Sequence, residues 1–301
     1  MSTQEALVIG REVAAEEKTP PPSGPRGSGG GASARRGFSL GRWLLPIYSA
    51  LALIFLLIPI VYTIVFSFNN TTKSNISWRG FTFDNWLHVC DAQGVCEAFG
   101  NSILIGVSAT LIATTLGTMI ALALARYKFR ARSAVNLLIF LPMATPEVVM
   151  GAGLAAQFLT AGVPKGLGTI ILAHSMFCLS FVVVTVKARV ASLDPALEDA
   201  GRDLYGSGGA VFWRITFPLL LPGILAAALL SFSLSFDDFI ITYFNAGSVS
   251  TFPTFIYTAA TRGIPAEANV IASAVFILAI VIVVGAQVAA TARAKRLART
   301  S

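Results

Sequence analysis

The connection at residues 188–216, "ARVASLDPALEDAGRDLYGSGGAVFWRIT", lies between two long apolar runs of this 301-residue chain. Asp194 can accept a hydrogen bond as a helix N-cap, and Pro195 suits the first helical position because proline has no N–H to leave unpaired. Two acids in the next turn favour the same helix, since a helix N-terminus carries partial positive charge. The sequence therefore predicts a short helix over about 195–204.

The second half of this connection contains a break and a further helical piece. The glycine-rich "YGSGG" (205–209) interrupts the first helix, and we expect a short amphipathic piece from 210 to 216. A solvated linker needs neither piece. We therefore interpret the connection as a docking element, and a plain linker is the alternative.

Apolar stretches long enough to cross a bilayer, which takes about 20 residues, lie on both sides of this connection. The chain is 55% hydrophobic and 12% charged, whereas soluble domains carry about 25% charged residues. We therefore predict an all-α membrane protein with six transmembrane helices. The predicted spans are residues 44–67, 102–125, 134–160, 167–187, 217–243 and 268–290. Pro142 and Pro146 predict a kink in the third span.

The basic residues predict the orientation of these spans. Of the 22 Lys and Arg residues, 18 lie before the first span, in the second and fourth connections, or after the last span. By the positive-inside rule, both termini and the docking connection are then cytoplasmic. We expect a disordered, Pro- and Gly-rich cytoplasmic tail over 1–42, a six-span domain over 43–292 and a basic cytoplasmic tail over 293–301. The expected location is a bacterial plasma membrane.

Several chemical functions are not expected of this chain. Cys90 and Cys96 share the first extracytoplasmic connection, where oxidation is possible, so a local disulfide and two free thiols are both open. No metal site is expected, because the chain has only two histidines and no second cysteine pair. It also lacks a GxxxxGK[ST] phosphate loop, so we expect neither a bound cofactor nor enzymatic activity.

Three acids lie inside predicted spans, where an acid costs about 2.5–3.5 kcal/mol to insert. They are Asp237 and Asp238 in the fifth span and Glu147 in the third. A helical wheel places Asp238 in a polar stripe and Asp237 outside it. The other members of the stripe are Ser231, Ser235, Thr242 and Asn245. We therefore predict that Asp238 faces a hydrated pathway and that Asp237 meets its edge or a neighbouring helix.

The charge of the acids also predicts the solute. We count no Lys or Arg in the span interiors, so a cationic solute would supply the missing countercharge. As alternatives, the acids are protonated, bond a partner helix, or pair with a base on another subunit.

The docking connection resembles a motif of the integral-membrane subunits of binding-protein-dependent ABC importers, EAA-x3-G-x9-I-x-LP. Here "DAG" (199–201) stands at EAA, Tyr205 at the glycine and "ITFP" (215–218) at I-x-LP. Each element departs from the motif, and Gly206 can supply the turn that Tyr205 does not. The resemblance covers about residues 44–290.

The resemblance implies a type I ABC importer permease fold in which this loop is the coupling helix that docks on an ATPase subunit. The residues to which that role carries over are Glu198, Asp199, Ala200, Gly201, Arg202, Asp203, Leu204, Tyr205 and Gly206. It also implies four partners: a second homologous permease, two ATPase subunits and an extracytoplasmic solute-binding protein. ATP and Mg would bind to the ATPases.

Further residues resemble the permeases of spermidine/putrescine importers, of the PotC type. That group has an S-x-D-D motif, here "SFDD" (235–238), and an acid after proline, here Pro146 followed by Glu147. The resemblance implies polyamine import. The alternatives are import of a quaternary amine, an amino acid, an aminophosphonate or ferric iron, and, in another class, a membrane scaffold that transports nothing.

Overall fold

The structure is a computed structural model that describes residues 40–71 and 75–300. Contacts divide the chain into two units, residues 1–54 and 55–301, and each is described by itself. In the first unit the described residues form the first half of helix α2 (Leu40–Phe66). The predicted tail over 1–42 lies outside the described residues, except that 40–42 are helical.

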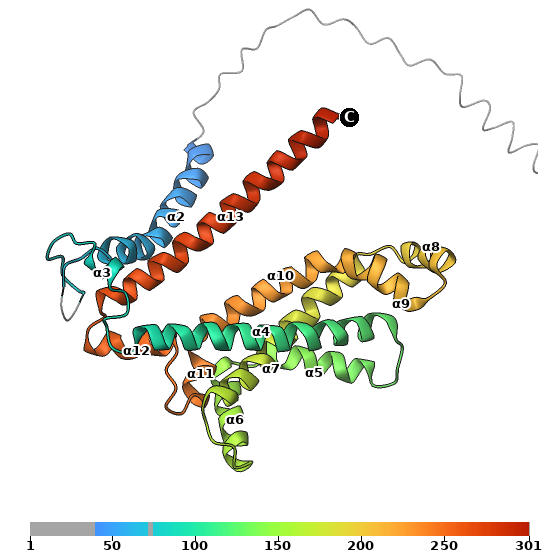
Figure 1. The fold of residues 1–301 in the computed structure, drawn as a ribbon, viewed down its shortest axis with the longest axis horizontal. Coiled ribbons are helices and arrows are strands. Elements are labelled where there is room, and N and C mark those ends of the chain that lie inside the picture. The colour runs from blue at the N-terminus through green and yellow to red at the C-terminus, as the bar shows by residue number, and fades with distance from the viewer. Residues whose placement is uncertain (1–39, 72–74, 301) are drawn as a thin grey trace, which may run out of the picture. The chain divides into compact units, whose positions relative to one another are not determined.

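The second unit is almost entirely helical (Figure 1). Beyond the end of α2, its helices are α3 (Asp84–Leu87), α4 (Val95–Arg126), α5 (Arg132–Ala144), α6 (Glu147–Thr160), α7 (Leu167–Ala191), α8 (Ala196–Tyr205), α9 (Gly208–Val211), a π-helix η1 (Phe212–Thr216), α10 (Phe217–Phe236), α11 (Ile240–Asn245), α12 (Phe252–Arg262) and α13 (Ala266–Thr300). The basic segment predicted as a tail over 293–301 is therefore helical through residue 300.

Five described helices are long and apolar enough to cross a membrane, and α5 with α6 makes a sixth span if the bent pair counts as one. These two helices meet at an angle of 109°. The predicted kink in the third span is thus a full break, because Pro146 precedes α6 and its ring cannot continue the ladder of α5. These spans are identified by the length and composition of the helices alone.

Helices α4, α7 and α10 pack together and contain most of the buried apolar residues (Figure 1). Small residues let α4 and α7 approach closely. A Cβ atom added at Gly117 would lie 2.6 Å from Cγ1 of Val182, so only glycine fits there without a shift. Close contact through small residues is a general device of membrane helices, for which the hydrophobic effect supplies little association energy.

The fifth predicted span, 217–243, begins where α10 begins but extends beyond its end. The continuous helix begins earlier, because α9 and η1 run directly into α10 and together span 208–236. It ends at Phe236, and residues 237–239 belong to neither α10 nor α11, which begins at Ile240. We call residues 237–239 the acid break.

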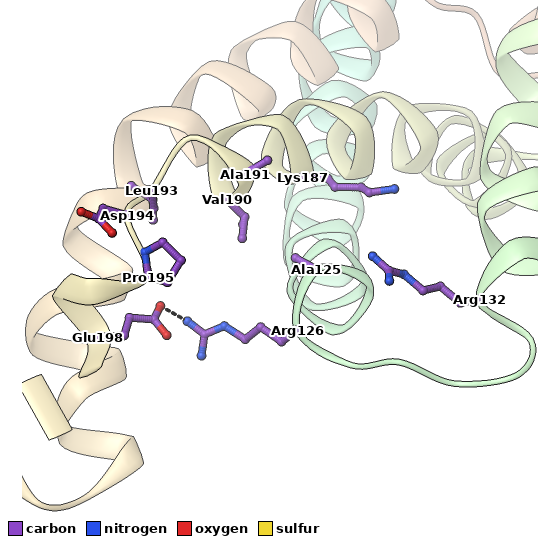
Figure 2. Close-up of a pocket in the computed structure, with 10 residues that line it drawn as sticks. All are labelled: Ala125, Arg126, Arg132, Lys187, Val190, Ala191, Leu193, Asp194, Pro195 and Glu198. Atoms are coloured by element: carbon purple, nitrogen blue, oxygen red, sulfur yellow. Dashed lines mark hydrogen bonds and ion pairs between the residues drawn. The ribbon is translucent and has the colours of Figure 1, made fainter. Parts of the chain in front are cut away.

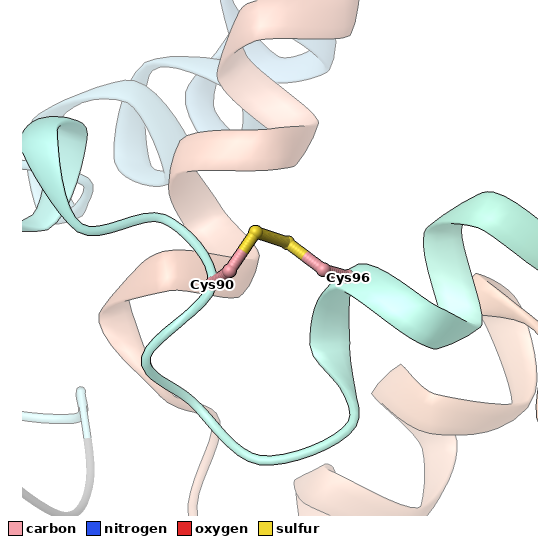
Figure 3. The surroundings of a disulfide bond; sticks show 2 residues. All are labelled: Cys90 and Cys96. Atoms are coloured by element: carbon pink, nitrogen blue, oxygen red, sulfur yellow. A yellow bond between two sulfur atoms is a disulfide. The ribbon is translucent and has the colours of Figure 1, made fainter.

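A disulfide joins Cys90, in the loop ahead of α4, to Cys96, the second residue of α4 (Figure 3). The loop that it closes packs on an apolar cluster in which Val95 and Ala268 are fully buried. Phe255 of α12 also belongs to this cluster. The disulfide therefore closes a short loop at the start of α4, and this loop packs against α12 and the first turns of α13.

Candidate functional site

Asp238 lies in the acid break and is only 8% exposed. Its Oδ1 accepts a hydrogen bond from the backbone N–H of Thr242 at 3.0 Å. The same oxygen lies 3.4 Å from Nε2 of His174 on α7. A carboxylate in this position has both a backbone donor and an imidazole beside it, which lowers the cost of its burial.

His174 is the hub of this network and is 1% exposed. Its Nδ1 lies 2.8 Å from Oγ of Ser235, and its Nε2 lies 2.9 Å from Oγ1 of Thr242. Each ring nitrogen thus has one hydroxyl as its hydrogen-bond partner. A neutral imidazole can make both bonds, because it offers one donor and one acceptor. The imidazole therefore joins the end of α10 and the first turn of α11 to α7.

The polar stripe predicted to line a hydrated pathway is instead buried against protein. Ser235, Thr242 and Asn245 are each at most 4% exposed. Ser231 is fully buried, and its hydroxyl has no hydrogen-bond partner among the described residues. The prediction failed because the wheel assumed one helix through 217–243 and because the count of charges in the spans left out His174.

Asn245 fastens the other end of α11. Its side-chain Nδ2 donates to the backbone carbonyl of Gly151 on α6 at 3.2 Å. The backbone carbonyl of Asn245 accepts from Oγ1 of Thr169 on α7 at 2.9 Å. Gly151 permits this approach, since a Cβ there would lie 3.3 Å from Cα of Ile241. Two broken spans, α5–α6 and α10–α11, are thereby held together next to the acids.

Glu147 and Asp237 are the exposed acids of this region. Glu147 is the first residue of α6, and Asp237 caps the C-terminal end of α10. Glu147 is close enough to both Asp237 and Asp238 for their charges to interact. The structure thus reverses the predicted order: Asp237 and Glu147 are accessible, and Asp238 serves the buried network.

The predicted docking helix forms as α8, and Gly206 ends it with φ of 72°, a conformation that glycine adopts without strain. Asp194 accepts from the N–H of Ala196 at 2.9 Å, as expected of a capping side chain. The second predicted piece, 210–216, is not separate but continues into α10. Residues 206 and 207 join α8 to this continuous helix, so the connection between α8 and α10 contains a single short break.

The predicted docking residues divide into two groups. Glu198 forms an ion pair with Arg126, the last residue of α4, and accepts from Oγ1 of Thr216 at 2.9 Å. Gly201 is buried with its Cα toward Ile215. These two residues hold α8 against its own chain, and the role of Glu198 in docking on a partner stays a prediction.

The remaining docking residues present an exposed surface. Leu204 is 79% exposed, a high value for a large apolar side chain. The other exposed members are Asp199, Ala200, Arg202, Asp203 and Gly206. The side chain of Tyr205 lies outside the described residues. The exposed surface of α8 is therefore mixed, with charged side chains around Leu204.

A cavity of about 360 Å³ lies beside the Glu198–Arg126 pair (Figure 2). It is lined by residues from the ends of α4, α5, α7 and α8.

The described residues contain no group of three His, Cys, Asp or Glu side chains that could hold a metal ion. Sequence reasoning did not place His174 beside the acids or Arg126 beside Glu198, although an imidazole inside an apolar span was a signal that pointed to a partner for the acids.

This fold is that of a permease subunit of an ABC importer. The structure resembles a chain of a bacterial ABC transporter involved in the import of the acidic polysaccharide alginate, with a TM-score of 0.58 at 16% identity over 82% of this chain and 98% of that one. It also resembles a chain of a bacterial alginate ABC transporter in complex with an alginate pentasaccharide-bound periplasmic protein, with a TM-score of 0.56 at 18% identity over 81% and 92%.

The chain belongs to the binding-protein-dependent transport system inner membrane component family, whose model matches residues 113–298. It is 33% identical over 257 residues to the spermidine/putrescine transport system permease protein PotC of Escherichia coli (strain K12), which covers 85% of this chain and 97% of that one. It is 32% identical over 227 residues to the putrescine transport system permease protein PotI of the same organism, which covers 73% and 80%. This is therefore a multi-pass inner membrane protein.

Proposed function

We propose that this chain forms half of the translocation pathway of an ATP-driven importer of spermidine, putrescine or related cationic amines. The observation that carries the proposal is the pair of exposed carboxylates, Glu147 and Asp237, at the meeting point of two broken spans. Polyamines carry ammonium groups that such carboxylates attract. The similarity to permeases named for spermidine and putrescine supports the same solute class.

The fold does not determine the solute, because a structural relative is involved in the import of an acidic polysaccharide. Discrimination then comes from pathway side chains together with the proposed solute-binding protein. Asp238 contributes indirectly, since its network with His174 fixes the ends of α10 and α11 and thus the place of Asp237. Broken helices near the midplane are a recurring site of solute binding in transporters.

The proposed assembly contains a second homologous permease, two ATPase subunits and an extracytoplasmic solute-binding protein. ATP and Mg bind to the ATPases in this proposal, and this chain catalyses no reaction. The excess of Lys and Arg in alternate connections supports cytoplasmic termini and a cytoplasmic α8. The exposed Leu204 and its charged neighbours provide the surface on which an ATPase docks.

Uptake into proteoliposomes tests the solute. The complete transporter is reconstituted with its binding protein, and labelled spermidine uptake is competed with putrescine, a quaternary amine, an amino acid and ferric iron. We expect the polyamines alone to compete. Competition by another of these solutes and none by polyamines would contradict the proposal.

Two carboxylate variants test the pathway. Glu147→Gln and Asp237→Asn each remove one charge-assisted contact, so we expect at least about a tenfold loss of spermidine uptake at subsaturating solute. Glu97→Gln is the matched control, because Glu97 is also an exposed acid in the first turn of its helix. Wild-type uptake by both variants would remove these acids from the pathway.

A further inference from the structure

Three basic residues converge at one end of the helical core. Arg126 is the last residue of α4, Arg132 is the first of α5, and Lys187 lies near the end of α7. All three line the same cavity of about 360 Å³, and Figure 2 shows Arg132 and Lys187 approaching it from different helices. Cations that lie close together repel one another, and this repulsion costs free energy unless an anion binds between them.

The acids at this cavity compensate only part of that charge. Glu198 is paired with Arg126, and Asp194 accepts from the backbone of its own loop. Lys187 donates to a neutral acceptor, Oδ1 of Asn136, at 2.7 Å and has two further donors. The guanidinium of Arg132 has no acceptor among the residues that the structure describes. Two cations are thus available to an external anion.

An apolar groove leads away from these cations. It has a volume of about 270 Å³ and runs between α5 and α7, with Phe140 and Ile139 on one side and Val184 on the other. Lys187 lines both the groove and the cavity, so the two spaces meet at its side chain. Phe140 is 52% exposed, which leaves the groove open on the outer surface of α5.

The depth of the cations matches the headgroup region of a membrane. The apolar part of α7 runs for 20 residues, 167–186, before Lys187. At about 1.5 Å per residue this length is about 30 Å, the thickness of the hydrocarbon core of a bilayer. Lys187 therefore lies about one hydrocarbon thickness from the start of α7, and the groove extends along α7 on both sides of it, from Val183 to Ala191.

We propose that this cavity and groove bind an anionic phospholipid of the cytoplasmic leaflet, with its phosphate between Arg132 and Lys187 and an acyl chain along the groove. The cytoplasmic leaflet carries anionic lipids that basic pockets between membrane helices bind. The apolar groove favours a lipid over a free phosphate ion, which would use only the cations. The cytoplasmic placement rests on the proposed orientation, and the lipid site is separate from the proposed solute pathway.

Native mass spectrometry of the complete transporter in detergent tests the proposal. Phosphatidylglycerol and phosphatidylcholine with identical acyl chains are added in turn, and retained lipid is counted. We expect retention of phosphatidylglycerol only. The double variant Arg132→Gln/Lys187→Gln should reduce it by about 30-fold, at about 1 kcal/mol for each basic residue. The control Lys128→Gln/Arg130→Gln removes equal charge from exposed positions outside the cavity and should retain the lipid.

Two further arms separate a lipid from a free anion. Ala188→Trp fills the groove and leaves every cation in place, so it should also reduce phosphatidylglycerol retention. Inorganic phosphate at millimolar concentration should not displace the lipid. Equal retention of both lipids, wild-type retention by the double variant or by Ala188→Trp, or displacement by phosphate would each overturn the proposal. Co-purification of partner subunits reports whether each variant still folds.

Discussion

His174→Leu should destabilise the protein, because it removes the imidazole that holds the acid break against α7. The variant loses the contacts at 2.8 Å to Ser235 and at 2.9 Å to Thr242. Thr242 keeps a hydrogen bond to the carbonyl of Asp238 at 3.2 Å. Leucine fills a similar volume, so the effect isolates the polar contacts from the cavity that alanine would leave.

The size of the destabilisation depends on which hydrogen bonds the hydroxyls of Thr242 and Ser235 keep in the variant. Thr242 loses one of two partners, a net cost of about 1 kcal/mol. Ser235 is 4% exposed and has no other partner among the described residues. An orphaned buried hydroxyl costs about 1–3 kcal/mol. The free energy of unfolding should therefore fall by about 2–4 kcal/mol, which lowers the melting temperature by roughly 3–6 °C for a chain of this size.

Thermal unfolding of the purified transporter, followed by intrinsic fluorescence, measures the shift. Ser175→Ala is the matched control on the neighbouring residue, because Ser175 donates only to the carbonyl of Ile171 in its own helix. That control should lie within about 2 °C of wild type. His174→Gln retains a donor and an acceptor and should recover part of the loss. A His174→Leu melting temperature equal to that of the control would refute the role of the network.

Three further predictions concern the packing and the loops. Gly117→Ala places a Cβ 2.6 Å from Val182 and should lower the free energy of unfolding by about 1–3 kcal/mol, measured by thermal unfolding. Glu198→Ala breaks the partly exposed pair with Arg126, whereas Glu198→Gln keeps an acceptor for the neighbouring hydroxyl. ATP hydrolysed per solute transported should rise in Glu198→Ala and less in Glu198→Gln. Equal ratios in both variants and wild type would contradict a coupling role of the contacts of Glu198 with Arg126 and Thr216. Cys90→Ser should cost about 2 kcal/mol by releasing a short loop and should make the melting temperature insensitive to reductant.

The positions of the spans could be predicted from sequence because runs of apolar residues suffice to identify them. The break before α6 was foreseen as a kink, since Pro142 and Pro146 mark it locally. The break after Phe236 has no proline or glycine within 233–239. Its contacts come from α7, about 60 residues away in the chain, and local pattern cannot report them.

The candidate site could be predicted in its residues but not in their roles. The carboxylates were identified as unusual, yet their order of exposure was inverted, because a wheel carries no information on where a helix stops. Glu198 was assigned to a partner by resemblance, although its bond to Arg126 depends on the packing of α8 near the end of α4. Local signals located α8 correctly, since caps and glycine act within a few residues.

In the proposed importer, the continuous helix over 208–236 would work as a lever. Its 29 residues measure about 43 Å at about 1.5 Å per residue. If an ATPase tilts the α8 end by about 10°, the far end moves by about 7–8 Å, more than one helical turn. That far end carries Asp237, so a small rotation outside the membrane becomes a large sideways stroke of a single negative charge.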